Sequence, residues 1–400
     1  MAGWFLAPAR IVVNAAAGTM CRPGRGIERS RRWGVQPPVR GLTTALLLGA
    51  LMPWGLPPAR AAAEPRVRVT GRVGDSGPFR EGSLQARVGE SVQLRVQVLD
   101  RRGRAQPLPP GARVLWRRVS PHMQHEHTPP PNEGISQYSN SVLFGPEHGR
   151  WLGYDSVEYE TRALEHEGET LVLDAAREPG EPLGRFGGAG SIWLAARVLL
   201  PDGTALSTPD GADTDRLGLR AEVMRVSFRL GDDFLGWLGT YFHVPNVFGS
   251  TGPQADRYVG ADCADVLVGA RRASGGRRLG YTSVGGIARV ARAVTPALAF
   301  DAHGRVVDET GAEVHLRWGD DLRPGDLLAI DYTRAGPLMP RAWDHIGALV
   351  GDHPEEGLPG VLDGADRLRH MTPRGLLDLP VGREGPIRFR VWRWRAPPRS

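Results

Sequence analysis

The chain has 400 residues, enough for two ordinary domains, and 41% of them are hydrophobic, which is sufficient to give each domain a core. Its formal net charge is +6 at pH 7, but residues 1–63 hold eight arginines and one glutamate, a net +7 that leaves −1 for the remainder. A basic surface for nucleic acid is therefore not expected on the rest of the chain, and we predict no nucleic-acid partner.

Residues 1–63 have the features of an export signal. Arg31, Arg32 and Arg40 precede the apolar run "GLTTALLLGALMPWGLPP", which is too short and too interrupted by proline to span a bilayer. Small residues at 61–63 then offer a cleavage site. We expect a chain that is exported, periplasmic or secreted, with no integral membrane span in its mature part. Because the signal is overlong, Met20 is an alternative start.

The pattern from 64 to 225 predicts strands. In "SVQLRVQVLD" the residues Val92, Leu94, Val96 and Val98 fall on one face at a period of two. Similar runs follow and are separated by turn signals such as "RRGR" and "PDG". This organisation predicts an antiparallel β-sandwich of the immunoglobulin-like kind.

One Pro-rich stretch in this region, "PHMQHEHTPPPNE", brings His122, His125, His127 and Glu126 close together in sequence. Imidazoles at this spacing could bind Zn or Cu, but a further ligand is not identifiable elsewhere in the chain. A solvated loop is the preferred interpretation, and neither a metal nor an organic cofactor is predicted.

The pattern changes near residue 226, where short helical stretches come first and strands follow. "CADVLVGARRASGG" and "YTSVGGIARVARAV" are typical of helices, and "GDLLAID", "HIGALVGD" and "IRFRVWRW" are typical of strands. Helices followed by an antiparallel sheet predict an α+β domain over 226–400.

The chain has only two cysteines, and Cys21 would leave with the signal. Cys263 would then be a single thiol in an oxidising compartment, which favours a buried or a functional role. Asp262 is a good N-cap, so Cys263 would lie in the first turn of a helix, where the helix dipole and free N–H groups favour a thiolate. The best candidate for its base is His345, which opens the strand-like run "HIGALVGD".

Four blocks carry a family resemblance. In chain order "VPNVFGSTG", "ADCADVLV", "LRPGDLLAI" and "DHIGALVGD" are similar to the blocks of the NlpC/P60 family of cell-wall cysteine peptidases, over residues 240–380. The resemblance implies a papain-like α+β fold and a peptide bond in the peptidoglycan stem as substrate.

Carried over by position, Cys263 would be the nucleophile and His345 the general base and acid. The family's third polar residue, which orients the imidazole, would be His370 in "RLRHMTPRGL", with Asp363 as an alternative. The residues expected around the substrate depart from the family pattern: Asp265 stands where the family has glycine, and Asn246 stands where a tyrosine often lines the site. The remaining residue expected there is Asp262.

The function predicted from these features is an exported cysteine hydrolase that cleaves an amide or peptide bond in peptidoglycan. Two alternatives stay open: an inactive binding module that keeps the fold, and an envelope adhesin or assembly factor that acts through the β-sandwich. The sequence predicts neither the bond that is cleaved, nor the ligand of the sandwich, nor the oligomeric state.

Overall fold

The computed structural model describes residues 65–123, 157–174, 186–276, 279–332 and 343–395. All of them belong to one compact unit, Ala61–Ser400. Strands greatly outnumber helices, and the chain is of the mixed α+β class. No helix in the described ranges is long and apolar enough to cross a membrane.

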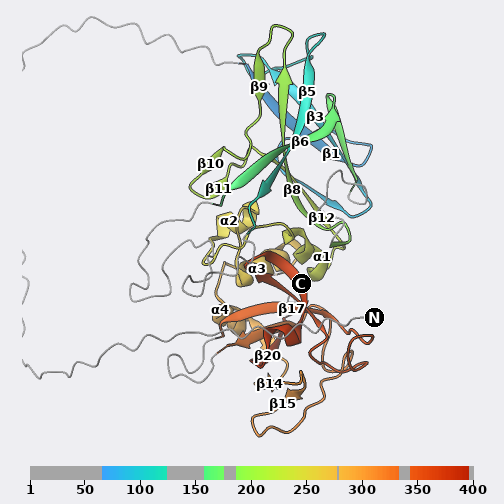
Figure 1. The fold of residues 1–400 in the computed structure, drawn as a ribbon, viewed down its shortest axis with the longest axis vertical. Helices are drawn as coiled ribbons and strands as arrows, with labels where there is room; N and C mark the ends of the chain where they lie inside the picture. Colours follow the sequence, from blue (N-terminus) through green and yellow to red (C-terminus); the bar gives the residue numbers. More distant parts are fainter. Residues whose placement is uncertain (1–64, 124–156, 175–185, 277–278, 333–342, 396–400) are drawn as a thin grey trace, which may run out of the picture. The chain divides into compact units, whose positions relative to one another are not determined.

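The N-terminal lobe, residues 65–229, consists of β-sheets, drawn in blue and green in Figure 1. One sheet contains β1 (Arg66–Val73), β3 (Ser91–Leu99), β4 (Ala105–Gln106) and β7 (Thr170–Asp174). A larger sheet has the order β2 (Leu84–Arg87), β12 (Met224–Arg229), β8 (Gly190–Leu199), β5 (Arg113–Pro121) and β6 (Tyr159–Glu167), and β9 (Ala205–Ser207) pairs with β8. A short hairpin is formed by β10 (Thr214–Asp215) and β11 (Gly218–Leu219).

The predicted alternation of this lobe holds in β3, where Val92, Leu94, Val96 and Val98 are buried in a core that also contains Trp116. Two details differ from the expectation. The β2–β12 pair is parallel, so the lobe is not purely antiparallel. Strand β12 also continues past the predicted boundary at residue 225, because it pairs with both β8 and β2.

The C-terminal lobe begins with short helices: α1 (Phe234–Leu238), the 3-10 turn η2 (Gly239–Tyr241), α2 (Gly252–Arg257), α3 (Cys263–Ala273) and α4 (Val284–Val290). A second 3-10 turn, η3 (Val381–Glu384), lies before the last strand. The sheet of the C-terminal lobe is antiparallel and has the order β15 (Val306–Val307), β14 (Leu298–Phe300), β20 (Arg388–Trp394), β16 (Leu327–Asp331), β17 (His345–Gly351), β18 (Arg367–Thr372) and β19 (Gly375–Pro380). In addition, β13 (Ala291–Ala293) pairs with β20. These elements are drawn in yellow to red in Figure 1.

This sheet is buried on both faces. In β16, Leu327 and Ala329 join the helices in one core, whereas Leu328 and Ile330 join a second core on the opposite face. The side chains on both faces of β16 are therefore apolar, and "LLAI" is a continuous hydrophobic run in the sequence.

A layer of buried polar groups links the two lobes. The hydroxyls of Ser191 on β8 and Ser227 on β12 lie 2.6 Å apart, and Ser191 donates to the carbonyl oxygen of Thr240, at 2.7 Å. The guanidinium of Arg225 donates to Ser227 and lies over the ring of Tyr258, 3.9 Å from its centroid. Because buried polar groups are costly without partners, this chain of hydrogen bonds fixes one docking geometry.

Helix α3 approaches η2 closely at Gly269. A Cβ built on Gly269 would overlap the hydroxyl of Tyr241, which is itself fully buried and stacked on Tyr258 with ring centroids 4.3 Å apart. Glycine is therefore required on this face of the helix, because the tyrosine has no room to withdraw.

We expect Gly269→Ala to lower the free energy of unfolding by about 1–3 kcal/mol, the usual cost of overpacking a core. Urea unfolding of the protein measures the change. The matched control is Gly285→Ala in α4, an exposed helical position where the nearest atom to the added Cβ is Ser283 Oγ at 3.9 Å. This control should be neutral or stabilising by up to about 1 kcal/mol, and equal losses in both variants would contradict the packing argument.

Candidate active site

Cys263 is the first residue of α3, as the sequence predicts. Asp262 is the N-cap, and its carboxylate accepts from the backbone N–H groups of Ala264 at 3.0 Å and Asp265 at 2.9 Å. The backbone N–H of Asp262 in turn donates to Ser250 Oγ at 2.9 Å. This local capping chemistry places the half-buried thiol of Cys263 at the start of a helix whose other face is buried.

The two predicted histidines meet on neighbouring strands. His345 opens β17 and His370 lies in β18, and the ring nitrogens His345 Nε2 and His370 Nδ1 are 2.8 Å apart, which is a hydrogen bond. The strand register sets Gly347 directly opposite His370. A Cβ on Gly347 would come within 2.7 Å of the His370 Cβ, so glycine leaves the space in which His370 sits.

The thiol lies beside the start of β17. The backbone N–H of Ile346, the residue after His345, interacts with the Cys263 thiol and acts to lower its pKa. The structure thus places the Cys263 thiol against the backbone of β17 next to His345, and it joins His345 to His370. Asp363, the alternative third residue, is engaged elsewhere: its carboxylate accepts from the backbone N–H groups of Leu358 at 2.5 Å and Ala365 at 2.7 Å.

Two further residues complete the cluster, and neither is among those predicted from the sequence. Glu384, at the end of η3, places Oε1 at 3.6 Å from His370 Nε2. Tyr332, just after β16, donates from its hydroxyl to Glu384 Oε2, and its ring centroid lies 6.1 Å from that of His345. The position of Tyr332 beside a predicted strand end was a usable signal, whereas Glu384 in "VGREGP" carries none.

The charge states differ from the expectation of a thiolate. Burial raises the pKa of the Cys263 thiol well above its ordinary value, and the negative charges of Asp262 and Asp265 add to the effect. These causes outweigh the helix dipole and the N–H of Ile346. Burial also lowers the pKa of His345 to about 3, with help from His370, and that of His370 to about 4. At rest the site therefore holds a neutral thiol and two neutral imidazoles.

The three residues expected around the substrate all have contacts within the protein. Asp262 caps α3, and Asn246 Nδ2 donates to the carbonyl oxygen of Thr372 at 3.0 Å, which ties the loop before α2 to the end of β18. Asp265 is buried and accepts from the Ser250 hydroxyl. Burial, followed by the charge of Asp262, raises the pKa of Asp265.

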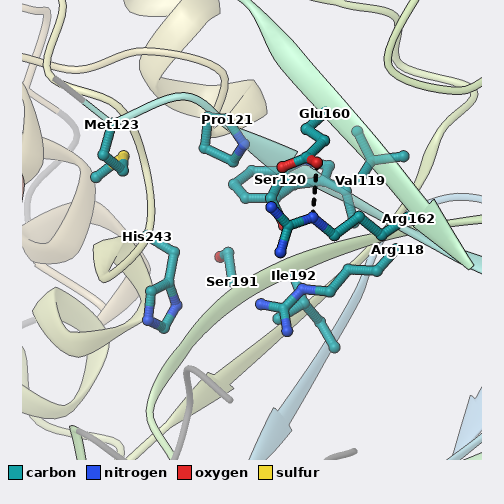
Figure 2. Close-up of a pocket in the computed structure, with 11 residues that line it drawn as sticks. Arg118, Val119, Ser120, Pro121, Met123, Glu160, Arg162, Ser191, Ile192 and His243 are labelled. Atoms are coloured by element: carbon teal, nitrogen blue, oxygen red, sulfur yellow. Dashed lines mark ion pairs between the residues drawn. The ribbon is translucent and has the colours of Figure 1, made fainter. Parts of the chain in front are cut away.

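A pocket of about 290 Å³ lies apart from these residues, between strands of the N-terminal lobe and the loop that carries His243. Figure 2 shows Arg118 and Arg162 side by side, with Arg162 paired to Glu160 at 2.6 Å. None of Cys263, His345 and His370 lines this pocket, so it is not where the thiol would react. The lining residues are Arg118, Val119, Ser120, Pro121, Met123, Glu160, Arg162, Ser191, Ile192, Trp193 and His243.

A metal centre does not emerge from the described residues: among them, no group of three or more His, Cys, Asp or Glu side chains is placed to hold an ion. In the histidine-rich stretch only His122 is described, and His125, Glu126 and His127 lie outside the described residues.

Comparison with known proteins gives no family for this chain, since no family model and no curated protein matches it.

The effect of the buried Asp265 carboxyl on the thiol can be tested. We expect Asp265→Asn to raise the rate of Cys263 alkylation by iodoacetamide at pH 9 by roughly three- to tenfold, because at this pH the Asp265 carboxyl is charged in spite of its raised pKa and opposes the thiolate. The control is Asp320→Asn, which removes the same charge at an exposed position. An unchanged rate in Asp265→Asn would show that the carboxyl does not act on the thiol.

The same variant has a predicted effect on stability. The pKa of Asp265 is raised on folding, so the wild type binds more protons folded than unfolded and loses stability as the pH rises above about 4. The advantage of Asp265→Asn in free energy of unfolding should therefore grow between pH 4 and pH 8. An advantage that shrinks over this range would contradict the raised pKa.

Proposed function

We propose that the chain is an exported cysteine hydrolase of the NlpC/P60 kind, which cleaves an amide bond in the stem peptides of peptidoglycan. The observation that carries the proposal is the hydrogen-bonded pair His345–His370 on a strand whose backbone, at Ile346, contacts the thiol of Cys263 at the start of α3. A nucleophile, a base and a residue that orients the base are the parts that thiol catalysis requires. The papain-like arrangement, the export and the peptidoglycan substrate rest on the resemblance of four sequence blocks.

The neutral resting state defines the first step. His345 takes the proton of the Cys263 thiol as the sulfur attacks the amide carbonyl, so a C–S bond forms while the S–H bond breaks. A free thiolate is not needed beforehand. The amides of Ala264 and Asp265 already donate to Asp262, which leaves the backbone N–H of Cys263 as the helix-start donor for the oxyanion.

The later steps return every group to its starting state. His345 gives its proton to the leaving amine as the C–N bond breaks, and a thioester remains on Cys263. Water then attacks this thioester, with His345 as the base that accepts a proton of the water. The C–S bond breaks, the acid product leaves, and the proton returns to the sulfur.

A second candidate function is a binding module that keeps this fold without turnover. Two carboxyls close to the thiol, at Asp262 and Asp265, oppose the thiolate that a fast cysteine hydrolase uses. Binding of soluble stem peptides by the wild type and Cys263→Ala with equal affinity, and cleavage by neither, would favour this candidate.

The hydrolase proposal predicts release of soluble fragments when mature wild-type protein is incubated with peptidoglycan and the supernatant is analysed by mass spectrometry. Cys263→Ala should release none above background, and His345→Gln should be about 10²–10⁴-fold slower, because the base is lost. The matched control is His303→Gln, an exposed histidine in a loop, which should retain full activity. The masses name the bond that is cut, and a silent wild type would refute the proposal.

A further inference from the structure

The side of His370 that faces away from His345 is occupied by a carboxylate. Nε2 of His370 is buried, and Glu384 Oε1 lies 3.6 Å from it, too far for a hydrogen bond at rest but close enough for a strong electrostatic effect. The other oxygen of Glu384 accepts from the hydroxyl of Tyr332, which fixes the orientation of the carboxylate. Tyr332, Glu384, His370 and His345, in this spatial order, thus form one connected line of polar groups.

Neutral imidazoles in this line can be protonated in two ways. In the first, His345 Nε2–H donates to His370 Nδ1, and the proton of His370 sits on Nε2, facing Glu384. In the second, His370 Nδ1–H donates to His345 Nε2, and a bare Nε2 lone pair of His370 faces the carboxylate. The second arrangement sets two electron-rich atoms against each other, so Glu384 favours the first.

The two arrangements differ in the reactivity of His345. In the first, Nδ1 of His345 is unprotonated and can accept a proton, which in the proposed mechanism comes from the thiol. In the second, Nδ1 already carries its proton, and the imidazole cannot act as the base. We propose that Glu384 is a positioning residue that selects the first arrangement, and so makes His345 Nδ1 the base; its catalytic consequence rests on the function proposed above.

Glu384 also offsets the charge that forms during the reaction. When His345 takes the proton it becomes an imidazolium in a buried site, and Glu384 is the group that raises the pKa of His345 against the effect of burial. The other carboxylate near His370 is that of Asp378, and it is held by Arg369 through two hydrogen bonds of 2.7 and 2.8 Å. The charge of Asp378 is thereby partly balanced, and Glu384 is the carboxylate that lies within 4 Å of a ring nitrogen of His370.

The tautomers can be read directly by ¹⁵N NMR of the mature chain labelled at histidine, with His345→Gln and His370→Gln used to assign the signals. At pH 7.5 the wild type should show both imidazoles protonated at Nε2 and bare at Nδ1. A wild-type His345 protonated at Nδ1 would overturn the proposal without any variant.

Glu384→Gln gives a second test, because this variant is expected to reverse the two tautomers. Tyr332 would hold the amide oxygen, and the NH₂ group would then face His370 Nε2, which favours a bare nitrogen there. The proton of His345 should therefore move to Nδ1. The matched control is Glu356→Gln. In the wild type the Glu356 carboxylate pairs at 2.6 Å with Arg367, which lies on the same strand as His370, and its replacement should leave both tautomers unchanged. Unchanged tautomers in Glu384→Gln would refute the selection.

Kinetics separate positioning from substrate binding. Glu384→Gln should lower kcat by about 10²-fold, the lower end of the range for a misplaced acid–base group, with KM within about twofold. If the wild type does not cleave peptidoglycan but the tautomers reverse in Glu384→Gln, the proposed hydrolase fails while the role of Glu384 in selecting the tautomer stands. A KM effect with unchanged kcat and unchanged tautomers would overturn it.

Discussion

The hydrogen bond between His345 and His370 is the contact on which the candidate site depends, and it exists only in one register of β17 against β18. A shift by one residue would move His370 to the opposite face of the sheet, since side chains alternate along a strand. Gly347 supports this register, because only a residue without a side chain leaves room for His370 opposite it. The pairing of His370 with β19 on its other side adds a further restraint.

The same sheet also restrains the thiol. Helix α3 is packed against β17 and β18, and Gly269 allows it to approach Tyr241 closely. Strand β8 of the N-terminal lobe is buried over most of its length because one face joins the core of that lobe and the other meets the C-terminal lobe. The position of Cys263 is therefore determined by packing that extends from the sheet through the helices to the N-terminal lobe.

The sequence predicts those parts of the site that depend on local chemistry. An aspartate before an apolar helical stripe is sufficient to place Cys263 at a helix start, and alternation or apolar runs are sufficient to find β3, β16 and β17. The sequence alone could not decide whether His370 or Asp363 is the third residue of the site, because that depends on the register between β17 and β18. Glu384 could not be found, because it reaches His370 through an irregular turn far away in sequence, and no periodicity describes such a contact.

The ionisation of the thiol was mispredicted for a related reason. Helix position favours a thiolate and can be inferred from sequence, but desolvation depends on what the fold packs around the sulfur. Here burial and two carboxyls hold the proton on Cys263, and burial keeps His345 neutral. This state suits a lone cysteine in the oxidising compartment that we propose for it, because oxidants attack the thiolate and not the thiol. The thiol would then react only when its sulfur attacks a bound carbonyl while His345 takes the proton. Protection from oxidation and catalysis would thus follow from the same environment.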